Sequence, residues 1–154
     1  MYSRILVPVD GSETSSRGLV EAIALASDQK ATLHLVHVIN DFPMLVELSS
    51  TASFESAVAR TRAFGDQVLA EAGELAAAAQ VRAERVLREV VEGRAADVIV
   101  REAQDAACDL IVMGTHGRRG LSRLAMGSDA DLVVRQSPVP VLMVRQTAPE
   151  RSKQ

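Results

Sequence analysis

Short apolar runs that alternate with segments of helical spacing restrict the fold of this chain more than any other feature. The four strongest runs are Ile5–Val9, Leu33–Ile39, Leu110–Met113 and Val139–Val144, and a weaker fifth run is Arg85–Val91. Nearly continuous apolar runs are typical of strands that are buried on both faces of a parallel sheet. We therefore expect five strands, most of them inside the protein.

The segments between these runs repeat their apolar residues at helical spacing. One such segment follows Ser12, a residue type that often caps helices, and is expected to carry Leu19, Val20, Ile23 and Ala26 on one face. Further helices are predicted over about residues 55–80, 96–107 and 128–137. This strict alternation predicts a single doubly wound α/β domain, with helices on both faces of the sheet.

Length and composition are those of one globular domain. We place the domain at residues 1–146 of the 154 and expect residues 147–154 to form a flexible tail. A net charge of -3 and an aromatic content of 3% provide neither the positive field nor the stacking platforms of a nucleic-acid-binding protein. No apolar run approaches the ~20 residues of a membrane helix, and no signal peptide is evident, so we expect a cytoplasmic protein. The single cysteine, Cys108, excludes an internal disulfide and is expected to be a small buried residue.

A glycine-rich loop follows the fourth apolar run. Gly114 and Gly117 come directly after Leu110–Met113, and Gly127 and Ser128 stand where the next helix begins. Glycine lets the backbone approach a ligand closely, and a helix N-terminus offers N–H donors and a positive dipole end to an anion. Three arginines suited to phosphate lie in the same segment: Arg118, Arg119 and Arg123. The spacing therefore predicts a phosphate-binding loop.

Two widespread nucleotide motifs are missing. The dinucleotide fingerprint requires Gly-x-Gly, which does not occur. The Walker loop requires a Gly-Lys-Ser/Thr ending, and the only lysines are Lys30 and Lys153. The predicted phosphate site is therefore of another kind.

Three stretches together carry a family resemblance: Ile5-Leu-Val-Pro-Val-Asp-Gly-Ser12, Leu35-Val-His-Val38 and the spacing Gly114-x2-Gly117-x9-Gly127-Ser128. With these, the chain resembles the universal stress proteins from residue 5 to residue 145, in particular their ATP-binding branch. The resemblance implies a five-stranded parallel sheet of order 3-2-1-4-5, as in the adenine-nucleotide alpha-hydrolase-like folds. It also implies ATP, with or without Mg²⁺, at the carboxyl ends of strands one and four, where open α/β sheets generally bind ligands.

The resemblance assigns a set of residues to the ATP site: Pro8, Val9, Asp10, Val38, Met113, Gly114, His116, Gly117, Arg118, Gly127, Ser128 and Asp129. In the family's pattern the first three lie beside the adenosine, and the backbone of Val38 meets the adenine edge. Met113 and Gly114 border the sugar. The later glycines, together with Arg118 and Ser128, hold the phosphates.

Three of these residues have a second interpretation. His116 either contacts phosphate or is a solvent-exposed loop histidine. Ser128 and Asp131 resemble a capping box, so the Ser128 side chain can cap the helix while backbone amides face the ligand. Asp129 stands where the family often has an apolar residue. Its carboxylate favours the helix dipole but either competes with a bound anion or binds a bridging metal ion.

Other polar residues have structural interpretations. His34 and His37 lie three residues apart on a predicted strand, so they point to opposite faces and cannot bind one metal ion together. The alternating charges between Arg82 and Glu89 are expected to form a solvated strand edge. We therefore expect no metal site of the protein's own.

These observations predict an ATP-binding universal stress protein that senses adenine nucleotide in the stress response and acts through a downstream partner protein. No nucleophile lies beside a base by spacing, so we expect no dedicated catalytic activity. Two alternatives stay open. One is a slow ATPase or autophosphorylating enzyme, in which Asp10 or His116 orients water, and the other is a nucleotide-free dimeric interaction module. An adenylyl-transferring enzyme is disfavoured, because Asp10-Gly-Ser-Glu stands where those enzymes carry His-x-Gly-His.

The family's strand order leaves two strands at the edges of the sheet. The segment 84–91 carries alternating charges that discourage pairing with another chain, whereas Val139–Val144 carries no charge. An edge this apolar is expected to pair with its own copy about a twofold axis, as it does in family members. We therefore expect a homodimer through residues 139–145, which proline at Leu142 or Val144 should separate.

Overall fold

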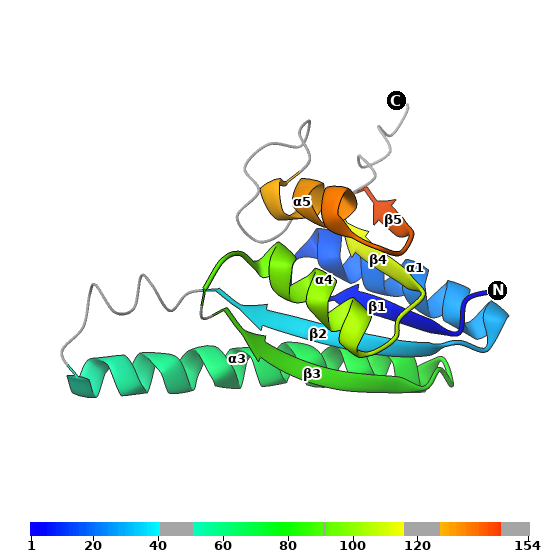
Figure 1. Ribbon diagram of the computed structural model, residues 1–154. Coiled ribbons are helices and arrows are strands. Elements are labelled where there is room, and N and C mark those ends of the chain that lie inside the picture. The colour runs from blue at the N-terminus through cyan, green and yellow to red at the C-terminus, as the bar shows by residue number, and fades with distance from the viewer. Residues whose placement is uncertain (41–50, 91, 116–126, 146–154) are drawn as a thin grey trace, which may run out of the picture.

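Strands and helices alternate along the chain as the sequence predicts (Figure 1). The structure is a computed structural model that describes residues 1–40, 51–90, 92–115 and 127–145, without the side chains of residues 51–53. The strands are β1 (Arg4–Pro8), β2 (Thr32–Ile39), β3 (Ala83–Glu89), β4 (Leu110–Gly114) and β5 (Val141–Val144). The helices are α1 (Glu13–Gln29), α3 (Thr51–Ala78), α4 (Ala95–Asp105) and α5 (Ser128–Gln136). None of these helices combines the length and the apolarity needed to cross a membrane. The predicted tail, residues 147–154, lies outside the described residues.

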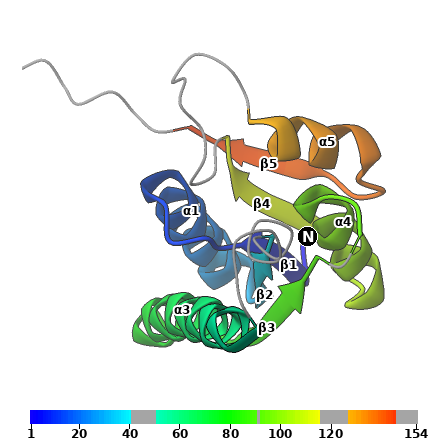
Figure 2. The ribbon, with the colours of Figure 1, turned by 90° about the vertical axis from the view of Figure 1, so that its left-hand side faces the viewer.

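All five strands form one parallel sheet in the order β3-β2-β1-β4-β5, which confirms the predicted order. The chain runs outward from β1 to β2 and β3, then crosses to β4 on the other side of β1 and continues to β5. Helices α1 and α3 cover one face of the sheet, and α4 and α5 cover the other (Figure 2). Because the winding reverses between β1 and β4, their carboxyl ends border the position where such sheets bind ligands.

Side chains of the strands fill a hydrophobic core on each face of the sheet. In β1, Ile5 and Val7 pack with α1 and α3, whereas Leu6 between them packs with α4 and α5. In β4, Val112 packs on the face covered by α1 and α3, and Ile111 on the face covered by α4 and α5. All five side chains are fully buried. This two-sided burial explains why the strands are continuous apolar runs rather than alternating ones.

The ends of α5 confirm one prediction and correct another. The predicted capping box of Ser128 and Asp131 is wrong. The N-cap is Gly127, with φ -61° and ψ 148°, and Ser128 is already the first helical residue, without a side-chain cap hydrogen bond. At the other end, the C-cap Ser137 has an extended backbone before Pro138, and the helix stops there as predicted.

Strand β5 begins two residues later than the apolar run predicts, at Val141 rather than Val139. The Ser137 hydroxyl donates to the carbonyl oxygen of Val139 at 2.7 Å and accepts its N–H at 3.2 Å. Both backbone groups of Val139 are therefore engaged locally. Pro140 follows and has no N–H to donate to a sheet.

Helix α1 approaches the carboxyl end of β4 so closely that a Cβ would clash at one position and be tightly crowded at another. A Cβ on Gly114 would lie 2.7 Å from Cγ2 of Thr14 and 2.8 Å from its carbonyl oxygen. A Cβ on Gly18 would lie 3.2 Å from the backbone nitrogen of Gly114. Backbone atoms cannot move aside as the end of a flexible side chain can. Both glycines are therefore needed for α1 to lie against β4.

Replacing Gly114 with alanine is expected to lower the free energy of unfolding by about 1–3 kcal/mol, the usual cost of forcing a methyl group into a packed contact. Gly73→Ala is the matched control. A Cβ at Gly73 meets Cδ of the flexible Arg85 side chain at 2.9 Å, and alanine within a helix is favoured over glycine by about 0.5–1 kcal/mol. Urea unfolding of both variants measures the difference. Equal stability of Gly114→Ala and the wild type would contradict the close contact.

Candidate functional site

Four segments converge at the carboxyl edge of the sheet, the edge that Figure 2 looks onto: the ends of β1 and β4 and the starts of α1 and α5. Thr115, just beyond β4, joins two of them. Its carbonyl oxygen accepts the N–H of Gly127 at 2.8 Å, and its own N–H donates to the carbonyl oxygen of Val144 at 3.0 Å. The start of α5 is thereby held against the end of β4.

The turn between β1 and α1, residues 9–12, is organised by its own hydrogen bonds, and we call it the β1 turn. The Asp10 carboxylate accepts the N–H of Ser12 at 2.9 Å, and the N–H of Asp10 donates to Oγ of Ser15 at 3.1 Å. Oγ of Ser12 accepts the N–H of Ser15 at 3.1 Å, which confirms Ser12 as the cap of α1. Gly11 has a φ of +78°, a conformation that favours glycine. The position of the Asp10 carboxylate is therefore set by the turn itself.

The first turn of α5 brings backbone donors and negative side chains to the same place. The N–H groups of Ser128, Asp129 and Ala130 have no acceptor within the helix, and the helix dipole places partial positive charge there. Asp129 is half-buried in this turn, whereas the Asp131 carboxylate pairs with Nε of Arg135 at 2.8 Å. An anion at this helix end would therefore be attracted by the amide donors and repelled by the Asp129 carboxylate.

Most of the sequence-predicted ATP-site residues lie along this edge: Pro8, Val9, Asp10, Val38, Met113, Gly114, Gly127, Ser128 and Asp129. His116, Gly117 and Arg118 lie outside the described residues. Val9 and Met113 are only 4% and 7% exposed. A ligand at this edge would therefore meet mainly the backbone of these two residues.

Sequence reasoning missed several residues that build this edge. Thr14 and Ser15 are buried polar residues at the start of α1, and Gly18 allows the close approach to β4. His37 of β2 and Phe64 of α3 contact the β1 turn. An isolated glycine within a helical pattern costs about 1 kcal/mol relative to alanine, so Gly18 offered a signal of a special packing position. The other contacts join residues far apart in the sequence and leave no local pattern.

Comparison with known proteins decides the family of this fold. The family model for universal stress proteins matches residues 1–145. The chain belongs to the universal stress protein family. A universal stress protein of Methanocaldococcus jannaschii is 32% identical over 150 residues, which cover 97% of this chain and 86% of that protein.

Solved structures of universal stress proteins share the fold. Another protein of Methanocaldococcus jannaschii matches with a TM-score of 0.84 at 25% identity, over 97% of this chain and 99% of that one. A universal stress protein in complex with cAMP matches with a TM-score of 0.68 at 25% identity, over 95% and 98% of the two chains. A universal stress protein family protein of Arabidopsis thaliana with AMP bound matches with a TM-score of 0.68 at 19% identity, over 97% of each chain.

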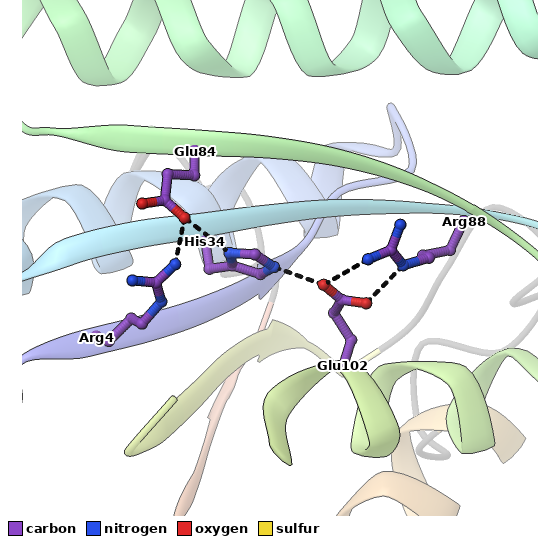
Figure 3. A network of polar contacts seen from close by, with 5 residues as sticks. All are labelled: Arg4, His34, Glu84, Arg88 and Glu102. Atoms are coloured by element: carbon purple, nitrogen blue, oxygen red, sulfur yellow. Dashed lines mark hydrogen bonds and ion pairs between the residues drawn. The ribbon is translucent and has the colours of Figure 1, made fainter. Parts of the chain in front are cut away.

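In this universal stress protein a second polar cluster lies between the sheet and α4 (Figure 3). Glu102 of α4 is 5% exposed, and its Oε1 lies 2.8 Å from Nε2 of His34. Its Oε2 accepts a hydrogen bond from Nε of Arg88 at 2.6 Å. On the other side of His34, Nδ1 lies 3.5 Å from Oε2 of Glu84, which also pairs with Arg4. Glu102 thus joins α4 to β2 and β3.

This cluster corrects one prediction and agrees with another. The charges of β3 do not form a wholly solvated edge, because two of them belong to the cluster and Glu89 pairs with Nε of Arg62 on α3 at 2.5 Å. His34 and His37 do point to opposite faces, toward α4 and α3 respectively. In the described part of the chain, no three side chains of metal-binding type are grouped closely enough to hold an ion.

Cys108 is buried, as the sequence predicts. Burial raises the pKa of the Cys108 thiol to about 11, with Arg4 acting in the opposite direction. The thiol is therefore protonated at neutral pH, and its chemistry is that of a packing residue.

The charge state of Glu102 is set by two opposing effects. Burial by itself raises the pKa of the carboxyl group, but the hydrogen bonds and charges of Arg88 and His34 outweigh it, and the pKa lies below its ordinary value of 4.5. The folded pKa is therefore lower than the unfolded one. The carboxylate adds stability at any pH above the unfolded pKa, and this contribution is lost as the pH falls through the folded pKa.

Glu102→Gln is expected to lower the free energy of unfolding near pH 7 by about 1–3 kcal/mol, because Arg88 and His34 lose a charged acceptor. The difference from wild type should shrink as the pH falls below 4.5, the ordinary pKa at which the carboxyl group of the unfolded chain takes up its proton, and vanish below the lower folded pKa. Urea unfolding over a series of pH values measures the loss of stability near pH 7 and its decrease at acid pH. A difference that stays constant through the acid range would contradict the ionised carboxylate.

Proposed function

We propose that this chain is an ATP-binding universal stress protein, which binds an adenine nucleotide between the ends of β1 and β4 and reports nucleotide state to a partner protein. The observation that carries the proposal is the 2.8 Å hydrogen bond from Gly127 to Thr115. It holds the first turn of α5, whose amides have no acceptor within the helix, beside the end of β4. A helix N-terminus at the switch point of an open α/β sheet is a common site for nucleotide phosphates.

Two relatives support an adenine nucleotide as the class of ligand. One was solved in complex with cAMP and the other with AMP bound. Adenosine is common to both ligands, so the half of the site that would hold adenosine has the stronger support. The triphosphate rests on the spacing Gly114-x2-Gly117-x9-Gly127-Ser128, which is the pattern of the ATP-binding branch.

The proposed roles follow the order of the residues along the edge. Pro8, Val9 and Val38 offer backbone to the adenosine, with Asp10 beside the ribose or the base, and Met113 and Gly114 border the sugar. The phosphates lie at Gly127, Ser128 and the first turn of α5, together with His116, Gly117 and Arg118. A Mg²⁺ ion bound with the nucleotide would find hard oxygen ligands in the carboxylates of Asp10 and Asp129.

One observation favours a second candidate, a nucleotide-free interaction module. Asp129 lies in the same turn as the amide donors, so its negative charge opposes a triphosphate. The two candidates differ in a single measurable property, the binding of nucleotide.

Isothermal titration calorimetry with ATP, ADP, AMP and cAMP, each with and without Mg²⁺, tests the proposed function. We expect one ATP per chain, and mass spectrometry should find adenine nucleotide retained by gently purified protein. No heat of binding and no thermal shift at millimolar ATP would contradict the proposal and favour the nucleotide-free module. Phosphate release from bound ATP would identify the slow ATPase that the sequence leaves open.

Asp129→Asn is expected to tighten ATP binding about 3- to 10-fold without Mg²⁺, because it removes a negative charge from the turn that faces the phosphates. Asp131→Asn is the matched control. The Asp131 carboxylate is already paired with Arg135, so its replacement should change the ATP affinity less. Calorimetry at one low ionic strength compares the two. Weaker binding of Asp129→Asn with Mg²⁺ present would instead identify Asp129 as a metal ligand.

We also infer that the protein forms a homodimer through residues 139–145. Strand β5 is an edge strand of the sheet, and Leu142 on it is 39% exposed although it is a large apolar residue. The carbonyl oxygens of Pro140 and Val144 face β4, so by the alternation of a strand Leu142 also faces β4. The backbone groups directed outward are those of Val141 and Met143. Proline at Leu142 or Val144 would therefore disturb the sheet itself, which corrects the sequence-based choice of test.

Met143→Pro removes an outward N–H and is expected to separate the dimer, whereas Met143→Leu keeps that N–H and should leave the dimer intact. Light scattering measures the mass, which for a dimer is twice the 16.5 kDa of one chain. Circular dichroism checks that the proline variant is folded. A wild-type mass of 16.5 kDa would contradict the dimer.

A further inference from the structure

His37 of β2 contacts the first carbonyl group of the β1 turn. Its side chain is 4% exposed, and its Nδ1 lies 2.7 Å from the carbonyl oxygen of Val9. A carbonyl oxygen can only accept, so Nδ1 carries the proton of this bond. The N–H of Asp10 donates in turn to Oγ of Ser15 at 3.1 Å. The peptide group between Val9 and Asp10 is therefore held at both its C=O and its N–H.

Helix α3 supports His37 and the β1 turn together. The Phe64 ring lies edge-on to the His37 imidazole, with centroids 5.9 Å apart and planes at 71°. A Cβ on Gly11 would lie 3.3 Å from Cζ of Phe64 and 3.3 Å from Cγ2 of Val68, so the turn rests on these side chains. A Cβ on Gly65 would lie 2.8 Å from Cδ2 of His37, which shows how closely α3 covers the ring. The orientation of the imidazole is fixed by packing as well as by its hydrogen bond.

We propose that His37 is a positioning residue of the nucleotide site, which acts through the peptide group between Val9 and Asp10. The inference rests on the proposed function. Rotation of this peptide group would move Asp10 away from the N–H of Ser12, which its carboxylate holds at 2.9 Å. A turn that is already ordered before the ligand arrives loses less entropy on binding. His37 thereby contributes to affinity without touching the nucleotide.

His34 provides a matched control within the same strand. It lies three residues earlier, is also 4% exposed, and also has a buried hydrogen bond, but its partner is Glu102 on α4. Removal of either imidazole takes one hydrogen bond away from a buried acceptor, so both leucine variants are expected to lose stability. Only the partner of His37 belongs to the β1 turn.

ATP titrations of His37→Leu, His37→Asn and His34→Leu test the proposal. We expect His37→Leu to weaken ATP binding about 10-fold, whereas His34→Leu lowers Tm and keeps the wild-type affinity. His37→Asn should recover most of the affinity, because its amide N–H stands at the same distance along the side chain as Nδ1–H. Unchanged affinity in His37→Leu, or equal losses in the two leucine variants, would overturn the positioning role.

Hydrogen exchange in the nucleotide-free protein distinguishes failure of this inference from failure of the proposed function. In His37→Leu the amides of Asp10, Ser12 and Ser15 should exchange about 10-fold faster, out of proportion to those of β1. In His34→Leu they should change no more than the rest of the sheet. If the wild type binds no nucleotide, the proposed function fails, and these amides still decide whether His37 holds the turn.

Phe64→Leu covers the case in which His37→Leu does not fold. The Phe64 side chain is 38% exposed, so the fold should tolerate its replacement. Loss of the ring contact should increase exchange at the same turn amides, to a smaller extent than loss of His37. Turn amides that exchange at the wild-type rate in every folded variant would overturn the inference.

Discussion

The contact between α1 and the carboxyl end of β4 sets the geometry of the whole carboxyl edge. Because Gly18 and Gly114 have no side chains, the helix lies directly against the strand, with Thr14 over Gly114. The cap of α1 and the β1 turn are thereby brought beside the end of β4. Thr115, the next residue, then holds the start of α5. Gly114, which the family pattern connects with nucleotide binding, is thus also required for the packing of α1 against β4.

Two buried histidines on one strand show how polar groups are accommodated in a sheet that is covered on both faces. The Nε2 of His34 lies at hydrogen-bond distance from Glu102 and joins α4 to the sheet, and the Nδ1 of His37 donates to the Val9 carbonyl oxygen and holds the β1 turn. In this chain, the first histidine aligns a helix on the sheet, and the second aligns the edge at which we propose that nucleotide binds.

Local pattern predicted the elements well and their long-range contacts poorly. The continuous apolar runs were enough to predict a parallel sheet covered on both faces, but the strand order was predicted from the family resemblance. Ser128 was predicted as a cap because cap preferences do not distinguish two adjacent small residues, and the extended residue is Gly127. The β3 charges were predicted to face water because their partners lie far away in the sequence. Arg88 pairs with Glu102 of α4, Glu84 with Arg4 of β1, and Glu89 with Arg62 of α3. For the same reason the motif located the edge of the candidate site but did not reveal His37.

Amide chemical shifts during an ATP titration, followed by NMR, test most directly whether an adenine nucleotide binds between the ends of β1 and β4. We expect the largest shifts at Asp10, at Gly114 and in the first turn of α5, and small shifts at the opposite edge of the sheet, at residues such as Thr32 and Asp109. Shifts that are largest at that opposite edge, or an absence of shifts at saturating ATP, would contradict the proposed site.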